Sequence, residues 1–136
     1  MKKIILPGIL AGVAILVLGM IVSYIFMLIP AVAADYSNTN IMRQWQDPLM
    51  SLFFIYPFVL GIILAWVWNK SKTLFKGSAS KRGCNFGLTI WLIATVPGMF
   101  ITYTSMPYAF MTVISWTVGG LVNSLAAGGI FAKMNK

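Results

Sequence analysis

The stretch that decides the fold is residues 4–30, IILPGILAGVAILVLGMIVSYIFMLIP, which contains no Asp, Glu, Lys, Arg or His. Three later stretches share this property, and they are residues 48–68, 84–103 and 107–131. About 20 apolar residues in a helix span the roughly 30 Å hydrocarbon core of a bilayer, since a helix rises about 1.5 Å per residue. The sequence therefore predicts an all-α integral membrane protein, with a single domain built as a bundle of four transmembrane helices.

The composition separates this chain from soluble globular proteins. Hydrophobic residues make up 60% of its 136 residues and charged residues 9%, whereas an average soluble domain has about 25% charged residues. The net charge is +8, because ten Lys and Arg residues outnumber the two carboxylates, Asp35 and Asp47. In a soluble protein this balance would favour a nucleic-acid partner. Here the basic residues flank apolar spans, so we predict membrane lipids and no nucleic acid.

Nine of the ten basic residues lie at the ends of the chain or in the connection between the second and third spans, and Arg43 is the exception. Lys2 and Lys3 precede the first span, and Lys133 and Lys136 follow the fourth. The loop 69–83 between the second and third spans carries five more: Lys70, Lys72, Lys76, Lys81 and Arg82. The positive-inside rule then predicts an N-in/C-in topology, with residues 31–47 and 104–106 outside the cell. The expected location is the cytoplasmic (inner) membrane of a prokaryote.

The five loop cations have two interpretations. At about 1 kcal/mol per Lys or Arg near an anionic membrane surface, they could bind anionic lipid headgroups on the cytoplasmic side. The alternative is that they only set the topology. The sequence leaves both open.

The N-terminus also resembles a secretory signal peptide. Lys2 and Lys3 precede an apolar run, and Ala31 and Ala33 have the small-residue spacing of a cleavage site. A signal peptide has an apolar region of only about 7 to 15 residues, whereas this run extends from residue 4 to residue 30. An uncleaved first helix is therefore predicted.

The connections contain signals for local structure. Residues 39–46 place Ile41, Met42 and Trp45 on one side, which predicts a short amphipathic helix on the membrane surface. Asp47 and Pro48 are typical of an N-cap and a first-turn proline, so they predict the start of the second membrane helix. The third and fourth spans have a very short link and should form a tight antiparallel hairpin.

A short internal similarity relates the two halves of the chain. A shift of 79 positions places residues 19–24 (GMIVSY) over residues 98–103 (GMFITY), and a shift of 59 pairs Pro48 with Pro107 and Gly61 with Gly120. A true duplication would relate two same-sense helical hairpins by a pseudo-two-fold axis along the membrane normal. Similar packing requirements in both hairpins would also explain the match.

Small residues at helical spacing predict where the helices pack, because packing within lipid depends on close backbone approach. The fourth span has two adjacent rows of small residues and should contact two neighbours, at the centre of the packing. The bulkier second span should face lipid in part. The candidate packing residues are Gly8, Gly12, Gly19, Gly98, Gly119, Gly120, Ser124 and Gly128.

Two prolines lie inside the spans, Pro57 in the second and Pro97, beside Gly98, in the third. Proline removes a backbone hydrogen bond, and a broken helix can present carbonyl groups to a substrate. Packing kinks are the simpler interpretation. The polar side chains that could bind a ligand or line a path at this depth are Tyr56, Thr95, Ser115 and Asn123. Of these, Asn123 is expected to form a hydrogen bond across a helix interface.

The residue types disfavour catalysis. The chain has no His and no Glu, and Cys84 is its only cysteine, so we predict no enzyme activity, cofactor, metal site or intrachain disulfide. Uncharged spans also disfavour proton-coupled transport.

Two functional classes remain open. The first is a noncatalytic membrane protein that acts through helix–helix or lipid contacts, as a subunit, a scaffold or a binder of a lipid-like ligand, in a homo-oligomer or with a membrane partner subunit. The second is an oligomeric channel or passive carrier for a small neutral solute or an anion, which would use the helix breaks at Pro57 and at Pro97 and Gly98.

Overall fold

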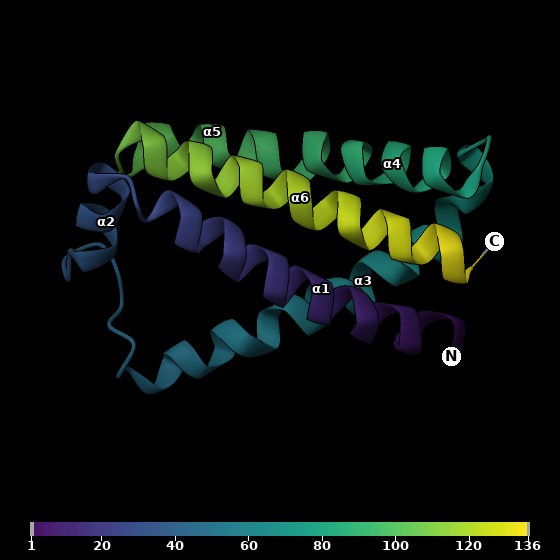
Figure 1. Cartoon of the computed structure of the whole chain (residues 1–136), viewed down its shortest axis with the longest axis horizontal. Helices are drawn as coiled ribbons and strands as arrows, with labels where there is room; N and C mark the ends of the chain where they lie inside the picture. Colours follow the sequence, from purple (N-terminus) through teal and green to yellow (C-terminus); the bar gives the residue numbers. More distant parts are fainter. Residues whose placement is uncertain (1, 136) are drawn as a thin grey trace.

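The computed structural model describes residues 2–135, and over this range the chain is helical and contains no strand (Figure 1). Four helices are long and apolar enough to cross a membrane. They comprise α1 (Lys2–Phe26), α3 (Ser51–Ser71), the continuous pair α4 (Ala79–Ile90) and α5 (Val96–Ser105), and α6 (Phe110–Met134). The predicted all-helical fold with four candidate membrane spans is therefore confirmed.

The helices pack side by side in the order α3, α1, α6, α4. Helix α6 lies at the centre, with α1 on one side and α4 on the other, as its two rows of small residues predict. Both termini lie at one end of the molecule (Figure 1). We call this the basic end, and we call the opposite end, which holds residues 38–47 and 106–109, the loop end.

Helices α1 and α3 cross at three glycines. Gly8 and Gly12 of α1 lie against Gly61 of α3, so closely that a Cβ on Gly61 would meet the Gly8 carbonyl oxygen. A Cβ on Gly12 would lie 2.8 Å from the Cα of Phe58. The neighbours are mainly backbone atoms, which cannot rotate away. Glycine is therefore what allows these two helices to touch.

A second glycine crossing joins α4 to α6. Gly83 and Gly87 of α4 lie against Gly128 and Ser124 of α6, and a Cβ on Gly87 would lie 2.6 Å from the Ser124 carbonyl oxygen. Each crossing thus pairs a Gly-x-x-x-Gly row with a single facing glycine. The two crossings hold the outer helices α3 and α4 onto the central pair.

The matching glycines do not follow the register of the internal similarity. Gly83 lies 75 positions after Gly8, and Gly128 lies 67 positions after Gly61. The predicted register used shifts of 79 and 59 and paired Gly61 with Gly120. The duplication itself stays a prediction.

An aromatic cluster closes the basic end. Trp68, Phe86 and Phe131 are buried, and they come from α3, α4 and α6. The ring centroids of Trp68 and Phe86 are 5.2 Å apart, and Phe75 stacks on Trp68 at 6.1 Å. The Trp68 indole N–H donates to the backbone oxygen of Asn135 at 3.2 Å. This end of the molecule is consequently well packed.

The outer segment folds differently from its sequence prediction. Residues 39–46 form turns, and the short helix is instead α2 (Pro30–Ser37). Pro30 explains the new helix, because proline suits the first turn of a helix, and α2 begins there. Proline also disfavours helix at the residue before it, so α1 ends at Phe26 rather than at Pro30. After α2, the Asn38 side chain accepts the Asn40 N–H at 3.0 Å, and this turn competes with helix.

The basic connection is shorter than the predicted loop 69–83. Helix α3 continues to Ser71 and is followed by a 3₁₀ turn, Lys72–Leu74. Helix α4 begins at Ala79, where the Ser78 hydroxyl accepts the Lys81 N–H at 3.4 Å as an N-cap. Lys81 and Arg82 are therefore helical rather than in a loop.

Candidate functional site

The polar residues proposed for a path do not gather at one place. Tyr56 is 59% exposed on α3. Ser115 is buried, but its hydroxyl donates to the Thr112 carbonyl oxygen of its own helix at 2.7 Å. Thr95 packs against α6, where its Cγ2 would lie 2.5 Å from a Cβ on Gly120. These side chains serve separate contacts.

Asn123 does not form the predicted interhelical hydrogen bond. Its Nδ2 would lie 3.4 Å from a Cβ on Gly19, so the amide packs against α1. Its Oδ1 is buried and has no hydrogen-bond partner within residues 2–135. The reason is that the facing surface of α1 is a glycine, which offers no side-chain donor. An unsatisfied buried carbonyl costs about 1–3 kcal/mol.

The two prolines have different local structures. Helix α3 runs through Pro57, which is buried, without the predicted break. Before Pro97, residues Trp91–Thr95 form a π-helical segment in which the Val96 N–H donates to the Trp91 carbonyl oxygen. The wider turn accompanies a contact with α6, because the Trp91 indole N–H donates to the Thr117 carbonyl oxygen at 2.9 Å. Such segments inside α-helices often mark functional sites.

The predicted packing glycines also differ in their surroundings. A Cβ on Gly98 would meet no atom within 4 Å, so this residue takes part in no close contact. A Cβ on Gly119 would meet only the Val22 side chain, at 3.7 Å, an ordinary distance. The closest approaches involve Gly61 and Gly83, which were not among the predicted packing residues. Their spacing from other glycines in the same helix could not show which neighbour they face.

Asp35 caps a helix that is distant in the sequence. Its Oδ2 accepts the Ala109 N–H at 2.8 Å and the Thr112 hydroxyl at 2.5 Å, and both groups belong to the start of α6. Ala109 is the N-cap residue of α6 and has no capping side chain of its own. A carboxylate there satisfies an otherwise unpaired N–H and interacts well with the helix dipole. No local sequence motif signals this role.

Aromatic residues next to Asp35 complete the contact at the loop end. The Trp116 indole N–H donates to the Tyr36 hydroxyl at 2.8 Å. The Tyr108 ring lies edge-to-face with Trp116 at 4.8 Å, and its hydroxyl donates to the Ile41 carbonyl oxygen at 3.2 Å. Helix α2 and the following turns are thereby attached to α6.

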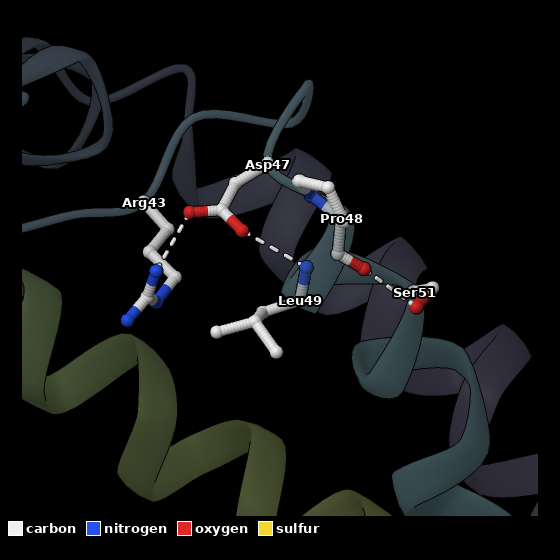
Figure 2. Close-up of polar contacts among 5 residues, drawn as sticks. All are labelled: Arg43, Asp47, Pro48, Leu49 and Ser51. Carbon is white, nitrogen blue, oxygen red and sulfur yellow. Dashed lines mark hydrogen bonds and ion pairs between the residues drawn. The ribbon is translucent and has the colours of Figure 1, made fainter.

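Asp47 starts the second long helix, α3, as its sequence predicts (Figure 2). Its carboxylate accepts the Leu49 N–H at 2.9 Å and the Arg43 guanidinium at 2.6 Å, and Pro48 begins the 3₁₀ turn Pro48–Met50 that leads into α3. The Leu49 N–H, followed by Arg43, holds the pKa of Asp47 below its ordinary value of 3.8, because both bind the charged form. Both carboxylates of the chain thus have structural partners.

The first part of α3 lies apart from the other long helices. Residues 51–56, which we call the α3 arm, are all exposed. Figure 1 shows α3 diverging from α1 toward the loop end. The ring contacts of the arm are local. The ring centroid of Trp45 lies 5.6 Å from that of Phe53 and 6.4 Å from that of Phe54. Apart from these local contacts, the apolar surface of the arm is exposed, and none of its six residues is buried.

A comparison with protein-family models, with curated proteins and with solved structures found no match to this chain. Functional inference rests on its own residues.

The cations of the basic end fall into two groups. Lys70, Lys76 and Lys81 are exposed. Arg82 is partly buried, and its guanidinium carbon lies 5.4 Å from the ring centre of Trp68. Arg82 is thus held in a defined position, whereas Lys70, Lys76 and Lys81 are exposed.

Proposed function

We propose that this chain is a noncatalytic integral membrane protein that acts through lateral contacts, as a subunit or scaffold that binds a second copy or another membrane subunit. The observation that carries the proposal is the α3 arm, residues 51–56, which is largely apolar and in which every residue is exposed. The rest of α3 is anchored on α1 through Gly61. A fixed helix with an exposed apolar first part is suited to a contact between molecules.

Helices that already lie in lipid associate by close packing rather than by the hydrophobic effect. Lipid tails are as apolar as the arm, so exposure there has little cost, and association depends on shape and dispersion contacts. The arm offers aromatic and aliphatic surface from Phe53, Phe54 and Ile55 to a partner helix. A lipid-like ligand could occupy the same surface.

The orientation we propose places the basic end in the cytoplasm of a prokaryotic cell. Arg43 is the one described basic residue at the loop end, and the positive-inside rule supports this direction. The α3 arm then lies in the outer leaflet.

The alternative function, a channel or passive carrier, has less support. It requires a shared path past Tyr56, Thr95 and Asn123. Tyr56 is on the exposed arm, Thr95 is packed at Gly120, and Asn123 faces α1. Another copy of the chain would have to complete any such path.

Cysteine crosslinking in native membranes tests the proposal. In a Cys84→Ala background, we expect Ile55→Cys on the arm to give a crosslinked dimer, or an adduct with another membrane protein, under mild oxidation. The matched control is Ile93→Cys in the π-helical segment Trp91–Thr95, because Ile93 is 70% exposed and Ile55 is 52% exposed. Equal crosslinking at both positions, or none at Leu52, Phe54 and Ile55, would show that the arm faces only lipid.

A further inference from the structure

Arg82 is seated on a buried aromatic surface at the start of α4. Its guanidinium lies over Trp68, which is 0% exposed, and its Nη2 donates to the Lys72 carbonyl oxygen at 3.3 Å. Trp68 is in turn fixed by Phe75 and Phe86. The cation–π contact and the backbone hydrogen bond hold this side chain in one orientation.

No carboxylate side chain pairs with Arg82 within residues 2–135. The carboxylate side chains there are Asp35 and Asp47, and they bind the start of α6 and Arg43 at the loop end. The Arg82 Nε is buried and has no acceptor among the residues that the structure describes, but the side chain as a whole is partly exposed. A partly buried cation without a described anionic partner is costly, so the exposed part of Arg82 is suited to an acceptor supplied from outside.

The surroundings identify the chemistry of that acceptor. Lys81 precedes Arg82, and its Cδ would lie 3.0 Å from a Cβ on Gly77, so its stem folds over the same turn. Lys76 is also exposed in this turn. A guanidinium in a lysine-rich connection, with no carboxylate partner among the described residues, favours a phosphate, since the planar fork of Arg matches phosphate oxygens.

We propose that Arg82, held by Trp68, binds the phosphate group of an anionic phospholipid headgroup. Trp68 lies in the last third of the candidate membrane span Pro48–Leu74, and tryptophan is enriched near headgroup depth. This inference rests on the proposed membrane orientation. It assigns the phosphate contact to one positioned residue, rather than to the exposed lysines as a group.

Lipid titration of the intact protein in a nonionic detergent tests the inference. Native mass spectrometry and thermal unfolding would follow added phosphatidylglycerol, with phosphatidylcholine as the uncharged reference. We expect phosphatidylglycerol to bind wild type at least tenfold more tightly than it binds Arg82→Gln. Arg82→Lys keeps the charge without the fork and should fall between them. Lys70→Gln removes the same charge from an exposed position and should stay within about twofold of wild type.

Separate arms identify the source of the phosphate. Millimolar glycerol phosphate that stabilises wild type as well as the lipid does would identify a free phosphate ester and overturn the assignment to lipid. Equal losses in Lys70→Gln and Arg82→Gln would overturn the role of Arg82, because they would mean diffuse attraction. Equal binding of phosphatidylcholine would overturn the anionic class. If Arg82→Gln unfolds without lipid, Arg82→Lys decides the outcome.

The two proposals fail separately. Loss of the lipid preference together with intact crosslinking through Ile55 would overturn only the Arg82 inference. Retained lipid preference without crosslinking would overturn only the contact function.

Discussion

Substitution of Gly61 by alanine tests the α1–α3 crossing most directly. The new methyl group would lie 2.8 Å from the Gly12 nitrogen and 3.2 Å from the Gly12 Cα, and it would also meet the Gly8 carbonyl oxygen. All three atoms belong to the backbone of α1. Since no rotamer change can relieve the clash, α1 and α3 must move apart.

The geometry sets the magnitude. An ordinary Cβ contact begins at 3.4 Å, so the pair at 2.8 Å requires a separation of at least 0.6 Å. A gap of about 0.5–1 Å forfeits a quarter to a half of each dispersion contact, and overpacking typically costs about 1–3 kcal/mol. Alanine also gains about 1 kcal/mol in helix propensity. We therefore expect a net loss of about 0–2 kcal/mol in the free energy of unfolding, against a gain at an open position.

Gly129→Ala provides the matched control, because a Cβ there would meet nothing within 4 Å. Its helix propensity gain of about 1 kcal/mol should appear without a clash. The assay is unfolding by sodium dodecyl sulfate in mixed micelles, followed by far-UV circular dichroism. Equal stability of Gly61→Ala and Gly129→Ala would refute the reasoning, because it would mean that the two backbones do not meet.

Three other substitutions test the polar contacts. Asp35→Ala removes the acceptor of the Ala109 N–H and should lower stability by about 1–2 kcal/mol in the same titration, with a smaller loss for Asp35→Asn; no loss would mean that α6 does not need this cap. The lowered pKa of Asp47 means that its contribution to stability is fully present above about pH 3.8 and is lost as the pH falls through the folded-state pKa. The melting temperature of wild type should therefore fall more steeply below pH 4 than that of Asp47→Asn. Parallel profiles of melting temperature against pH would count against the cap. Asn123→Leu removes the unsatisfied Oδ1 and should raise stability by about 1 kcal/mol, whereas a large loss would indicate a hidden hydrogen bond.

Some features of the fold could be predicted from short stretches of sequence. The uncharged runs predict four helices that are long and apolar enough to span a membrane, and these are present. Asp47 and Pro48 predict the start of α3, because an N-cap acts within three residues. The two rows of small residues on α6 predict its central place. Each of these signals is local, so the order of residues is sufficient to reveal it.

Other features depend on which helix faces meet. Asp35 and Ala109 are separated by 74 positions, and Trp68 and Asn135 by 67. An apolar helix with glycines on several faces does not specify its neighbour, so the sequence could not distinguish Gly61, which meets α1, from Gly98, which meets nothing. Likewise the Asn123 amide was expected to find a donor, but α1 presents a glycine there.

The sequence by itself determined that the chain is helical, that its spans carry no charge, and that its cations collect between alternate spans. These properties follow from composition and from a repeat of about 3.6 residues per turn. Only the tertiary structure decided that Arg82 rests on Trp68 with no carboxylate partner among residues 2–135, and that residues 51–56 are exposed. The physical reason is that burial and pairing are properties of two surfaces together, and the second surface comes from a distant part of the chain.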